Sequence, residues 1–475
     1  MKTHPLYLNG DWITCTDSQP VFNPATGEAF ARISLINRTR VAQALNDADA
    51  VSEGWRSLTG KARGEYLYKI AAVLEQRREA AARIITLENG KPLTQSLGEV
   101  AMSVDHLRWF AEEARRGYGR VVPHQVEGKW HLIIKTPVGV CGAISPWNFP
   151  LVLAVRKVAP ALAAGCPVVL KPASQTPLSA ITLAECVEAA GLPRGVFQVV
   201  VGPAAEIGEE FLQNPVCRKV TFTGSTEVGR CLIRGAAERI KLLSLELGGH
   251  APLLVFDDAD LDRAVEGAMV AKFRNTGQSC IAANRIYIQR NVYMRFIEAF
   301  VGRVKALRVG DGLESGTDVG PLIDEAAVDK VLNHVADAVS LGAHLACGGR
   351  RLPGRRGSFV EPTVLVDVPD EARCMSEETF GPVAPICQFE SEEEVVQRAN
   401  RSAYGLSAYV FTSNLQRAFR LMESLHAGTI GVNDAMPSTS QCPFGGVKES
   451  GWGRELGMEG MEAFLETKHA SVAMC

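Results

Sequence analysis

The spacing of apolar positions changes its period along the chain. Residues 41–116 are dense in Ala, Leu, Glu and Arg, and their helical spacing predicts several amphipathic helices. From about Val138, short β-rich apolar runs alternate with helical windows. The predicted strands are residues 138–144, 167–171, 196–201 and 219–222, and the helices between them are residues 151–164, 179–190 and 205–213. This order is typical of parallel βαβ units in a doubly wound sheet.

The same alternation begins again after Glu246. It predicts a strand over residues 251–256, a helix over 261–273, a strand over 285–289 and a helix over 292–307. Farther on, Ser391 precedes three glutamates in the pattern of a capping box, which predicts a helix over residues 392–399. We therefore expect a second α/β unit, with a cofactor in one unit and chemistry in the cleft between them.

Composition narrows the class of protein. At roughly 150 residues per domain, 475 residues indicate two or three domains. The 50 basic and 53 acidic residues give a net charge of −3, which argues against a nucleic-acid or acidic-membrane partner. Residues 1–12 do not resemble a signal peptide, and the apolar run at 158–170 is too short to span a bilayer. Twelve scattered cysteines are typical of reduced thiols. We expect a cytoplasmic enzyme.

Three polar residues stand where chemistry can be presented. Cys280 follows a predicted helix in a loop that Gly277 lets turn sharply, which suits a nucleophile, although an ordinary buried thiol is the alternative. Glu246 ends a strand among apolar neighbours, so we expect a raised pKa and a role as general base. Asn148 either donates to an oxyanion or caps the helix that Pro150 would begin.

Seven motifs, in chain order, resemble those of the aldehyde dehydrogenase superfamily over essentially the whole length. They are Pro146-Trp-Asn-Phe-Pro150, Lys171-Pro-Ala-Ser174, Phe222-Thr-Gly-Ser-Thr-Glu-Val-Gly229, Leu245-Glu-Leu-Gly-Gly249, Gly277-Gln-Ser-Cys280, Glu377-Glu-Thr-Phe-Gly-Pro382 and Pro443-Phe-Gly-Gly446. The resemblance implies that Cys280 is the nucleophile, Glu246 the general base and Asn148 an oxyanion donor together with the Cys280 backbone N–H. It also implies covalent catalysis, in which a thiohemiacetal passes hydride to a nicotinamide and Glu246 activates the water that hydrolyses the thioester.

The resemblance implies a fold as well. It consists of two interleaved doubly wound α/β domains and a small β arm for oligomerisation. The Rossmann-like cofactor domain takes residues 1–119 and 139–247, the catalytic domain 248–443, and the arm 120–138 and 444–475. The arm and its C-terminal strand pair across subunits in the family, and exposed strand edges are a liability in a monomer. We therefore expect a homodimer or homotetramer.

For the cofactor, residues 220–229 predict a strand, a tight turn and a helix start, whose N–H groups and Ser225 hydroxyl can hold a pyrophosphate. The resemblance places Glu378 at the nicotinamide ribose; the alternatives for Glu378 and Phe380 are a surface carboxylate and a core ring. The full set assigned to the cofactor is Trp147, Lys171, Ser174, Gly224, Ser225, Gly229, Leu247, Glu378 and Phe380.

Ser174 bears on the choice between NADP and NAD. Family members that prefer NAD commonly carry Glu at this position, and a carboxylate repels the 2′-phosphate of NADP. Lys171 and Ser174 together can accept that phosphate, so we predict that NADP is used well and that NAD is tolerated. No metal is expected.

Two arginines point to the substrate. Residues 151–166, 273–280 and 438–446 closely resemble the succinate-semialdehyde dehydrogenase branch, in which residues matching Arg156, Arg274 and Ser438 bind the distal carboxylate of the substrate. Guanidinium groups suit this task because they hold carboxylates through two hydrogen bonds. The alternatives are an Arg156 that is solvated and an Arg274 that caps the carbonyls of a helix. Ala282 stands where some relatives have a second Cys, so we expect no redox switch there.

The sequence therefore predicts an NAD(P)-dependent oxidation of succinate semialdehyde to succinate. Glutarate semialdehyde and 2-oxoglutarate semialdehyde are alternative substrates. A CoA-acylating dehydrogenase, in which CoA and not water takes the acyl group, is a different mechanistic class. The presence of Glu246 as a base for hydrolysis argues against it. A catalytically silent relative is the third alternative, but both the nucleophile and the base are present.

Overall fold

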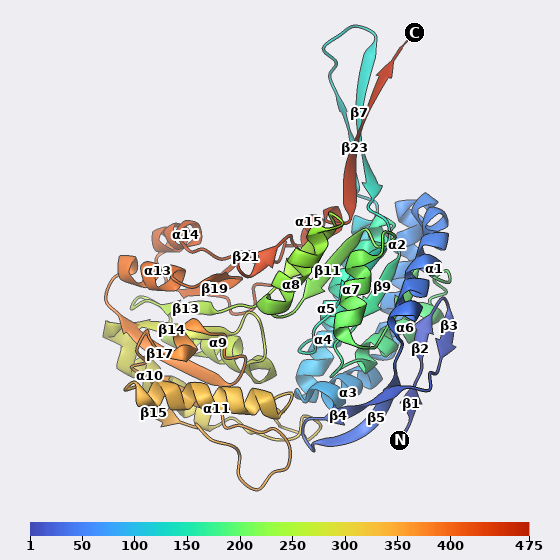
Figure 1. Cartoon of the computed structure of the whole chain (residues 1–475). Helices are drawn as coiled ribbons and strands as arrows, with labels where there is room; N and C mark the ends of the chain where they lie inside the picture. The colour runs from blue at the N-terminus through green and yellow to red at the C-terminus, as the bar shows by residue number, and fades with distance from the viewer. Residues whose placement is uncertain (475) are drawn as a thin grey trace.

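The computed structural model describes residues 1–474 and places two α/β sheets side by side, with a β arm projecting from one of them (Figure 1). The first sheet has six strands, in the order β10-β9-β8-β11-β12-β22. Five of them are parallel, and β22 pairs antiparallel with β12. Their bounds are β8 Cys141–Ile144, β9 Val168–Lys171, β10 Phe197–Val199, β11 Lys219–Thr223, β12 Leu242–Glu246 and β22 Gly451–Trp452.

Helices alternate with the strands of this sheet, as the sequence predicts. They are α5 Val152–Ala164, α6 Leu178–Ala189, α7 Ala204–Gln213 and α8 Thr226–Ala237, preceded by α1 Arg38–Ser57, α2 Gly60–Gln76, α3 Arg78–Asn89 and α4 Leu93–Glu113. Every residue of α5 is buried, because α2, α4 and the sheet pack around it. Arg156 and Lys157 lie in α5, so both of their charges are inside the protein.

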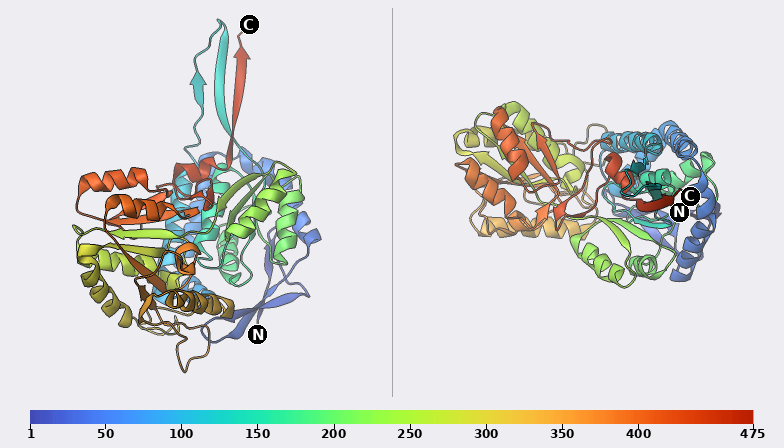
Figure 2. Two further views of the ribbon diagram at one scale, coloured as in Figure 1. Left: turned by 60° about the vertical axis from the view of Figure 1, so that its left-hand side comes forward. Right: turned by 90° about the horizontal axis from the view of Figure 1, so that it is seen from above.

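The second sheet has seven strands in the order β15-β16-β17-β14-β13-β19-β20, all parallel except β15. Its strands are β13 Ala251–Val255, β14 Ala283–Gln289, β15 His344–Cys347, β16 Thr363–Val366, β17 Val383–Phe389, β19 Ser407–Phe411 and β20 Thr429–Val432. Its helices are α9 Leu261–Phe273, α10 Tyr293–Lys305, α11 Glu325–Ser340, α12 Arg373–Ser376, α13 Glu392–Asn400 and α14 Leu415–Ser424. Seen from above, the two halves lie beside each other (Figure 2). The second α/β unit predicted from the sequence is present.

The capping box predicted for α13 is half formed. Ser391 Oγ accepts a hydrogen bond from the N–H of Glu394 at 3.2 Å, as expected for an N-cap. The Glu394 carboxylate, however, accepts from the N–H of Glu390 at 2.9 Å, one residue before the cap.

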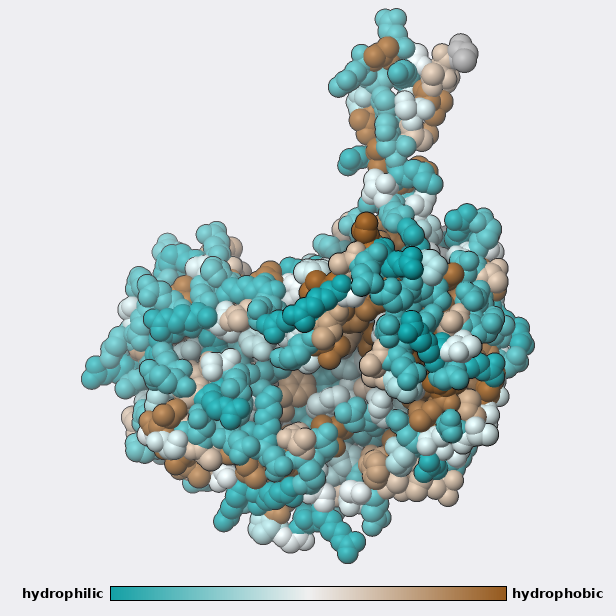
Figure 3. Space-filling view, in the orientation of Figure 1, coloured by the Kyte–Doolittle hydropathy of each residue, from teal (hydrophilic) through white to brown (hydrophobic). Residues whose placement is uncertain are grey.

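The arm is a three-stranded sheet of β6 Arg120–Val122, β7 Lys129–Pro137 and β23 Leu465–Ala473, in the order β23-β7-β6. It stands clear of the body in both side views (Figures 1 and 2). Trp130, Ile134 and Val472 are exposed on it, and brown apolar atoms are visible along it in Figure 3. Of the predicted arm segment 444–475, β22 and α15 Gly457–Glu462 instead lie on the body.

Shorter elements complete the described chain. They are β1 Thr3–His4, β2 Leu6–Leu8, β3 Asp11–Ile13, β4 Ser18–Asn23, β5 Glu28–Ser34, the 3₁₀ turns at Arg274–Gly277 and Arg290–Val292, β18 Tyr404–Gly405 and β21 Val447–Lys448. Within residues 1–474, no helix is both long and apolar enough to cross a membrane.

Candidate active site

Cys280 lies on the wall that two pockets share. The larger pocket has a volume of about 290 Å³ and is lined mainly by the loops that follow β8, β11 and β12 and by residues 378–380. The smaller one, about 50 Å³, is lined by side chains of α4, α5 and the loop around Met436. Figure 3 shows the surface hollowed between the two halves of the molecule. A group bound in either pocket therefore reaches the same sulfur atom.

The loop before Cys280 is strained and tightly packed. Asn275 and Thr276 have φ of 50° and 58°, in the left-handed region that such residues rarely adopt. A Cβ on Gly277 would lie 2.2 Å from the Gly381 carbonyl oxygen, and one on Gly249 would lie 2.0 Å from that of Cys280. Only glycine fits at these two positions. The strain, about 1–3 kcal/mol per residue, persists because the surroundings fix the loop.

The surroundings of Cys280 keep its thiol neutral. Burial raises its pKa well above the usual value, and the nearby carboxyl groups of Glu246 and Glu378 raise it further. Arg156 acts in the opposite direction and favours the thiolate. Attack by this sulfur therefore depends on positive charge near it.

Glu246 ends β12 and is buried, and its carboxyl group has no hydrogen-bond partner among residues 1–474. Burial, followed by the charge of Glu455, raises its pKa to about 8, as the sequence predicts. Glu246 is absent from the described residues that line the two pockets. Its charge nevertheless acts on Cys280, because it is the nearby charge that raises the pKa of that thiol most.

Beside Glu246 lies a buried polar cluster that the sequence did not reveal. Lys157 Nζ donates to Glu455 Oε1 and, at 2.6 Å, to Thr223 Oγ1, which belongs to the wall of the larger pocket. One signal was available: Lys157, next to Arg156, is one of two charged residues in a helix that is otherwise apolar. Its partner Glu455 lies 298 residues away, so only the fold identifies the pair.

Asn148 lies between the nucleophile loop and the first sheet. Its side-chain Nδ2 donates to the Gln278 carbonyl oxygen at 3.1 Å, and its residue lines the larger pocket with Cys280. The alternative, in which Asn148 caps a helix beginning at Pro150, is wrong. Helix α5 begins at Val152, and its N-cap position is Leu151.

Arg156, Arg274 and Ser438 all line the smaller pocket with Cys280. Arg156 Nη2 donates to Ser438 Oγ at 3.0 Å. The Arg274 guanidinium lies 5.1 Å from the centre of the Phe149 ring, and its closest polar contacts are methionine sulfurs at 3.6 and 3.8 Å. Thioether sulfur is a weak acceptor. Arg156 is therefore not solvated. Arg274 occupies the C-cap position of α9, but its side chain makes no hydrogen bond to the carbonyls that end this helix among the described residues.

These guanidinium groups give the smaller pocket a positive charge that suits an anion. Among residues 1–474, neither has a carboxylate within 4.0 Å. Burial lowers the pKa of Arg274, which reflects the cost of holding that cation away from water. Arg156 is buried and Arg274 is partly buried, and a cation shielded from water without a counter-charge is stabilised by an anionic ligand. The pocket is thus suited to a small molecule that carries a carboxylate at one end and reacts with Cys280 at the other.

The predicted cofactor residues divide between two places. Trp147, Gly224, Ser225, Leu247, Glu378 and Phe380 line the larger pocket. Glu378 Oε1 accepts from the Gly249 N–H at 2.9 Å, and burial raises its pKa to about 7. Phe380 meets Trp147 edge to face at 5.4 Å between ring centres. Glu378 is therefore not a surface carboxylate, and Phe380 faces a pocket instead of the core.

Lys171, Ser174 and Gly229 are not among the described lining of that pocket. Ser174 lines a separate cavity of about 530 Å³ between β4 and α11. Lys171 Nζ donates to the Pro172 carbonyl oxygen at 3.0 Å, and burial lowers its pKa to about 8. A Cβ on Gly229 would lie 2.5 Å from Leu247 Cδ2, so this glycine lets α8 approach the pocket wall.

Comparison with known proteins gives one consistent result. The model of the aldehyde dehydrogenase family matches residues 12–470. The chain is 48% identical over 465 residues to a glutarate-semialdehyde dehydrogenase of Pseudomonas aeruginosa, covering 98% of this chain and 96% of that one. It is 46% identical over 469 residues to an NADP(+) succinate-semialdehyde dehydrogenase of Escherichia coli, covering 98% and 97%.

Solved structures agree with this result. A crystal structure described as an E. coli NADP-dependent enzyme matches with a TM-score of 0.98 at 46% identity, covering 99% of this chain and 98% of that one. The succinate-semialdehyde dehydrogenase of Burkholderia pseudomallei matches with a TM-score of 0.97 at 45% identity, with the same coverage. The predicted two-unit α/β fold is confirmed.

Proposed function

The chain belongs to the aldehyde dehydrogenase family, and from this premise we propose that it oxidises succinate semialdehyde to succinate with NADP or NAD. The observation that supports the proposal most strongly is the smaller pocket, where Arg156, Arg274 and Ser438 share a wall with Cys280. The two guanidinium groups bind the distal carboxylate, and this places the aldehyde carbon at the sulfur. Holding both ends of the substrate converts the attack into an intramolecular step.

In the proposed reaction, the Cys280 thiol first loses its proton to solvent, and the resulting thiolate attacks the aldehyde carbon and forms a thiohemiacetal. The Asn148 amide and the Cys280 backbone N–H donate to the oxygen as it becomes negative, where such donors have their largest effect. A nicotinamide cofactor in the larger pocket supplies the hydride acceptor. Glu246 then takes a proton from the water that attacks the resulting thioester, which releases the acid and restores Cys280.

The larger pocket fits such a cofactor. The start of α8 presents backbone N–H groups beside Gly224 and Ser225, and a helix N-terminus favours phosphate. The Ser225 hydroxyl itself caps α8, accepting from the Val228 N–H at 3.3 Å, so in this state the hydroxyl is used within the protein. We propose that Glu378, which lines the same pocket, accepts from the ribose hydroxyl groups of the cofactor.

Glutarate semialdehyde is the second candidate substrate. A relative at 48% identity carries that name, and the substrate differs from succinate semialdehyde by one methylene group. 2-Oxoglutarate semialdehyde remains an alternative for the same reason, since its two ends are also an aldehyde and a carboxylate. Initial rates with C3–C6 aldehydes, with and without a terminal carboxylate and with both cofactors, test the proposal. Equal rates with and without the carboxylate would contradict it.

A substitution at Ser174 tests the cofactor assignment. We expect wild-type enzyme to have a kcat/KM with NADP at least comparable with that for NAD. Ser174→Glu should shift the ratio toward NAD by about tenfold or more, since a carboxylate near a 2′-phosphate costs about 1–3 kcal/mol. Ser174→Gln, which has the same size without the charge, is the control. A wild-type enzyme that ignores NADP would contradict the assignment.

The raised pKa of Glu246 predicts a pH dependence. Hydrolysis needs the carboxylate, so turnover should rise with pH and reach half its maximum near the pKa of about 8. The folded protein keeps a proton on Glu246 that the unfolded chain loses near pH 4, so this group lowers the stability as pH rises between about 4 and 8. In Glu246→Gln, the effect on stability should vanish, and any rise of the rate with pH that remains belongs to Cys280, whose pKa also lies above its usual value. Rates at pH 6–9 and thermal unfolding at the same values measure them.

We also propose that the arm forms the contact between subunits of a homodimer or homotetramer. The outer edge of β23 and the exposed Trp130 and Ile134 support this, because such an edge is open to pairing in a monomer. The proposed cofactor and catalytic domains keep the boundaries predicted from the sequence, whereas the proposed arm keeps residues 120–138 and β23 but not β22 and α15, which lie on the body. We propose that the protein works in the cytoplasm.

A further inference from the structure

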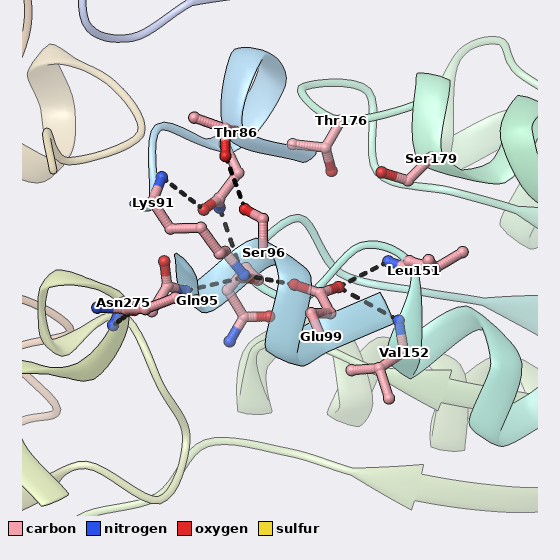
Figure 4. A network of polar contacts seen from close by, with 12 residues as sticks. Thr86, Lys91, Gln95, Ser96, Glu99, Leu151, Val152, Thr176, Ser179 and Asn275 are labelled. Carbon is pink, nitrogen blue, oxygen red and sulfur yellow. Dashed lines mark hydrogen bonds and ion pairs between the residues drawn. The ribbon is translucent and has the colours of Figure 1, made fainter. Parts of the chain in front are cut away.

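The turn between α3 and α4 holds one half of an ion pair that the proposed mechanism does not use; the other half lies in α4. Lys91 and Glu99 have fully buried side chains, and Lys91 Nζ lies 2.6 Å from Glu99 Oε2 (Figure 4). Gly90 in this turn has φ of 92°, and a Cβ there would lie 2.6 Å from Pro321 Cγ. Burying two charges costs desolvation free energy that their attraction often fails to offset. Stability alone is therefore a weak reason for this pair.

Lys91 makes a second hydrogen bond, to the candidate oxyanion donor. Its Nζ donates to the Asn148 carbonyl oxygen at 2.6 Å and lies 3.9 Å from the centre of the Phe149 ring. Asn275 Nδ2, from the nucleophile loop, donates to the same oxygen at 2.8 Å. The backbone of Asn148 is thus held from both sides.

Glu99 holds the other end of the same segment. Its Oε1 accepts from the N–H groups of Leu151 at 2.9 Å and Val152 at 3.2 Å (Figure 4). These are the first free N–H groups of α5, and Leu151 itself provides no side-chain cap. Glu99 therefore caps the helix that carries Arg156. One ion pair fixes residues 148–152, from the amide donor to the start of that helix.

The nucleophile loop is attached to the same helix α4. Gln95 Oε1 accepts from the Asn275 N–H at 2.8 Å. Asn275 Nδ2 also donates to the Gln278 carbonyl oxygen at 3.1 Å, which is the oxygen that accepts from the Asn148 side chain. The amide donor and the nucleophile loop therefore share a support in the first turns of α4.

We propose that Lys91, held by Glu99, is a positioning residue for Asn148. It fixes the Asn148 backbone so that the side-chain amide donates to the aldehyde oxygen while Cys280 attacks. This inference rests on the proposed function, in which Asn148 is the oxyanion donor. Such donors act through their placement, and a shift of about 1 Å costs about 100-fold in rate.

A double-mutant cycle tests the inference. Asn148→Ala should lower kcat by about 100- to 1,000-fold, the usual effect of losing one such donor. Lys91→Met should lower kcat by about 10- to 100-fold with succinate semialdehyde and with butanal alike, and should leave the KM for NADP unchanged. In the Asn148→Ala background, Lys91→Met should cost less than about threefold, because the group it positions is already gone.

Lys272→Met is the matched control. Lys272 is also fully buried, but its Nζ donates to Asn284 Oδ1 at 2.7 Å and not to Asn148. Any fold loss in kcat caused by Lys272→Met should therefore multiply with the fold loss caused by Asn148→Ala, as expected for independent sites. If Lys91→Met does not fold, Glu99→Gln keeps the shape of the side chain and removes the charge that holds Lys91. It should show a smaller loss that is again absent in Asn148→Ala.

The results distinguish the positioning role of Lys91 from the oxyanion role of Asn148 on which it depends. An Asn148→Ala enzyme with unchanged kcat would remove the proposed oxyanion role, and the inference would fail with it. A slow Asn148→Ala enzyme in which the Lys91→Met loss still multiplies in full would overturn the inference alone. An unchanged kcat in Lys91→Met would do the same.

Discussion

Glu246→Gln should release one equivalent of reduced cofactor per active site and then stall, whereas Cys280→Ala should show neither burst nor turnover. Hydride leaves the thiohemiacetal before water enters, so losing the base blocks only the later step. We expect the steady-state rate of Glu246→Gln to fall by about 100- to 10,000-fold. Stopped-flow absorbance measures the burst, and the mass of the intact protein reports the acyl group on Cys280.

The Glu246 substitution is structurally mild. Among residues 1–474 the carboxyl oxygens of Glu246 have no hydrogen-bond partner, and the neighbouring Glu455 raises the pKa of Glu246, so glutamine removes an unfavourable charge beside Glu455. Glu246→Gln should therefore melt no lower than wild type at pH 9. Full steady-state turnover in either variant would refute the assigned roles.

Arg274→Ala should lose about 30-fold to several thousand-fold in kcat/KM for succinate semialdehyde. Removing one partner from a buried charged pair costs about 2–5 kcal/mol, and Arg274 has no other strong acceptor among the described residues. The same variant should oxidise butanal about as well as wild type does, because butanal has no carboxylate to hold. Initial rates with both aldehydes give the comparison.

The rate with butanal distinguishes a loss of carboxylate binding from a general structural defect in the variant. Arg274 packs on Phe149, next to Asn148, so a collapse of this region would slow both substrates. Arg274→Lys provides a second check: it keeps the charge but loses the planar fork, and should retain part of the preference. Wild-type enzyme that prefers butanal, or equal losses in Arg274→Ala, would leave only the broad family assignment.

Much of this architecture can be predicted from the sequence, because buried parallel strands are short apolar runs that helices separate. The same logic locates Cys280 and Glu246 at the ends of elements, where loops present side chains. The arginines are also visible as charges in apolar surroundings. Each of these signals is local, and each lies within one segment of the chain.

What the sequence missed depends on distant segments meeting. Lys157 contacts Glu455, which lies 298 residues away in the sequence, and Asn148 contacts Lys91, which lies 57 residues away. Lys91 and Glu99 fall in a stretch whose composition fits an amphipathic helix with a solvated face, so nothing marks their burial. The side chain of Glu394 shows the limit on a smaller scale: the motif predicts the cap, while the local backbone decides which N–H the carboxylate accepts from.

The arm has a consequence for the order of folding. In the sequence, its strands β7 and β23 come before and after the strands of both large sheets. Lys135 and Thr467, which touch across the arm, are 332 residues apart. Closing so long a loop costs about 5 kcal/mol of chain entropy, unless the intervening chain has already folded and brought its ends together. The arm should therefore form late, after both α/β units. Since subunits are proposed to meet through it, only chains with a finished active site would present the surface that joins them.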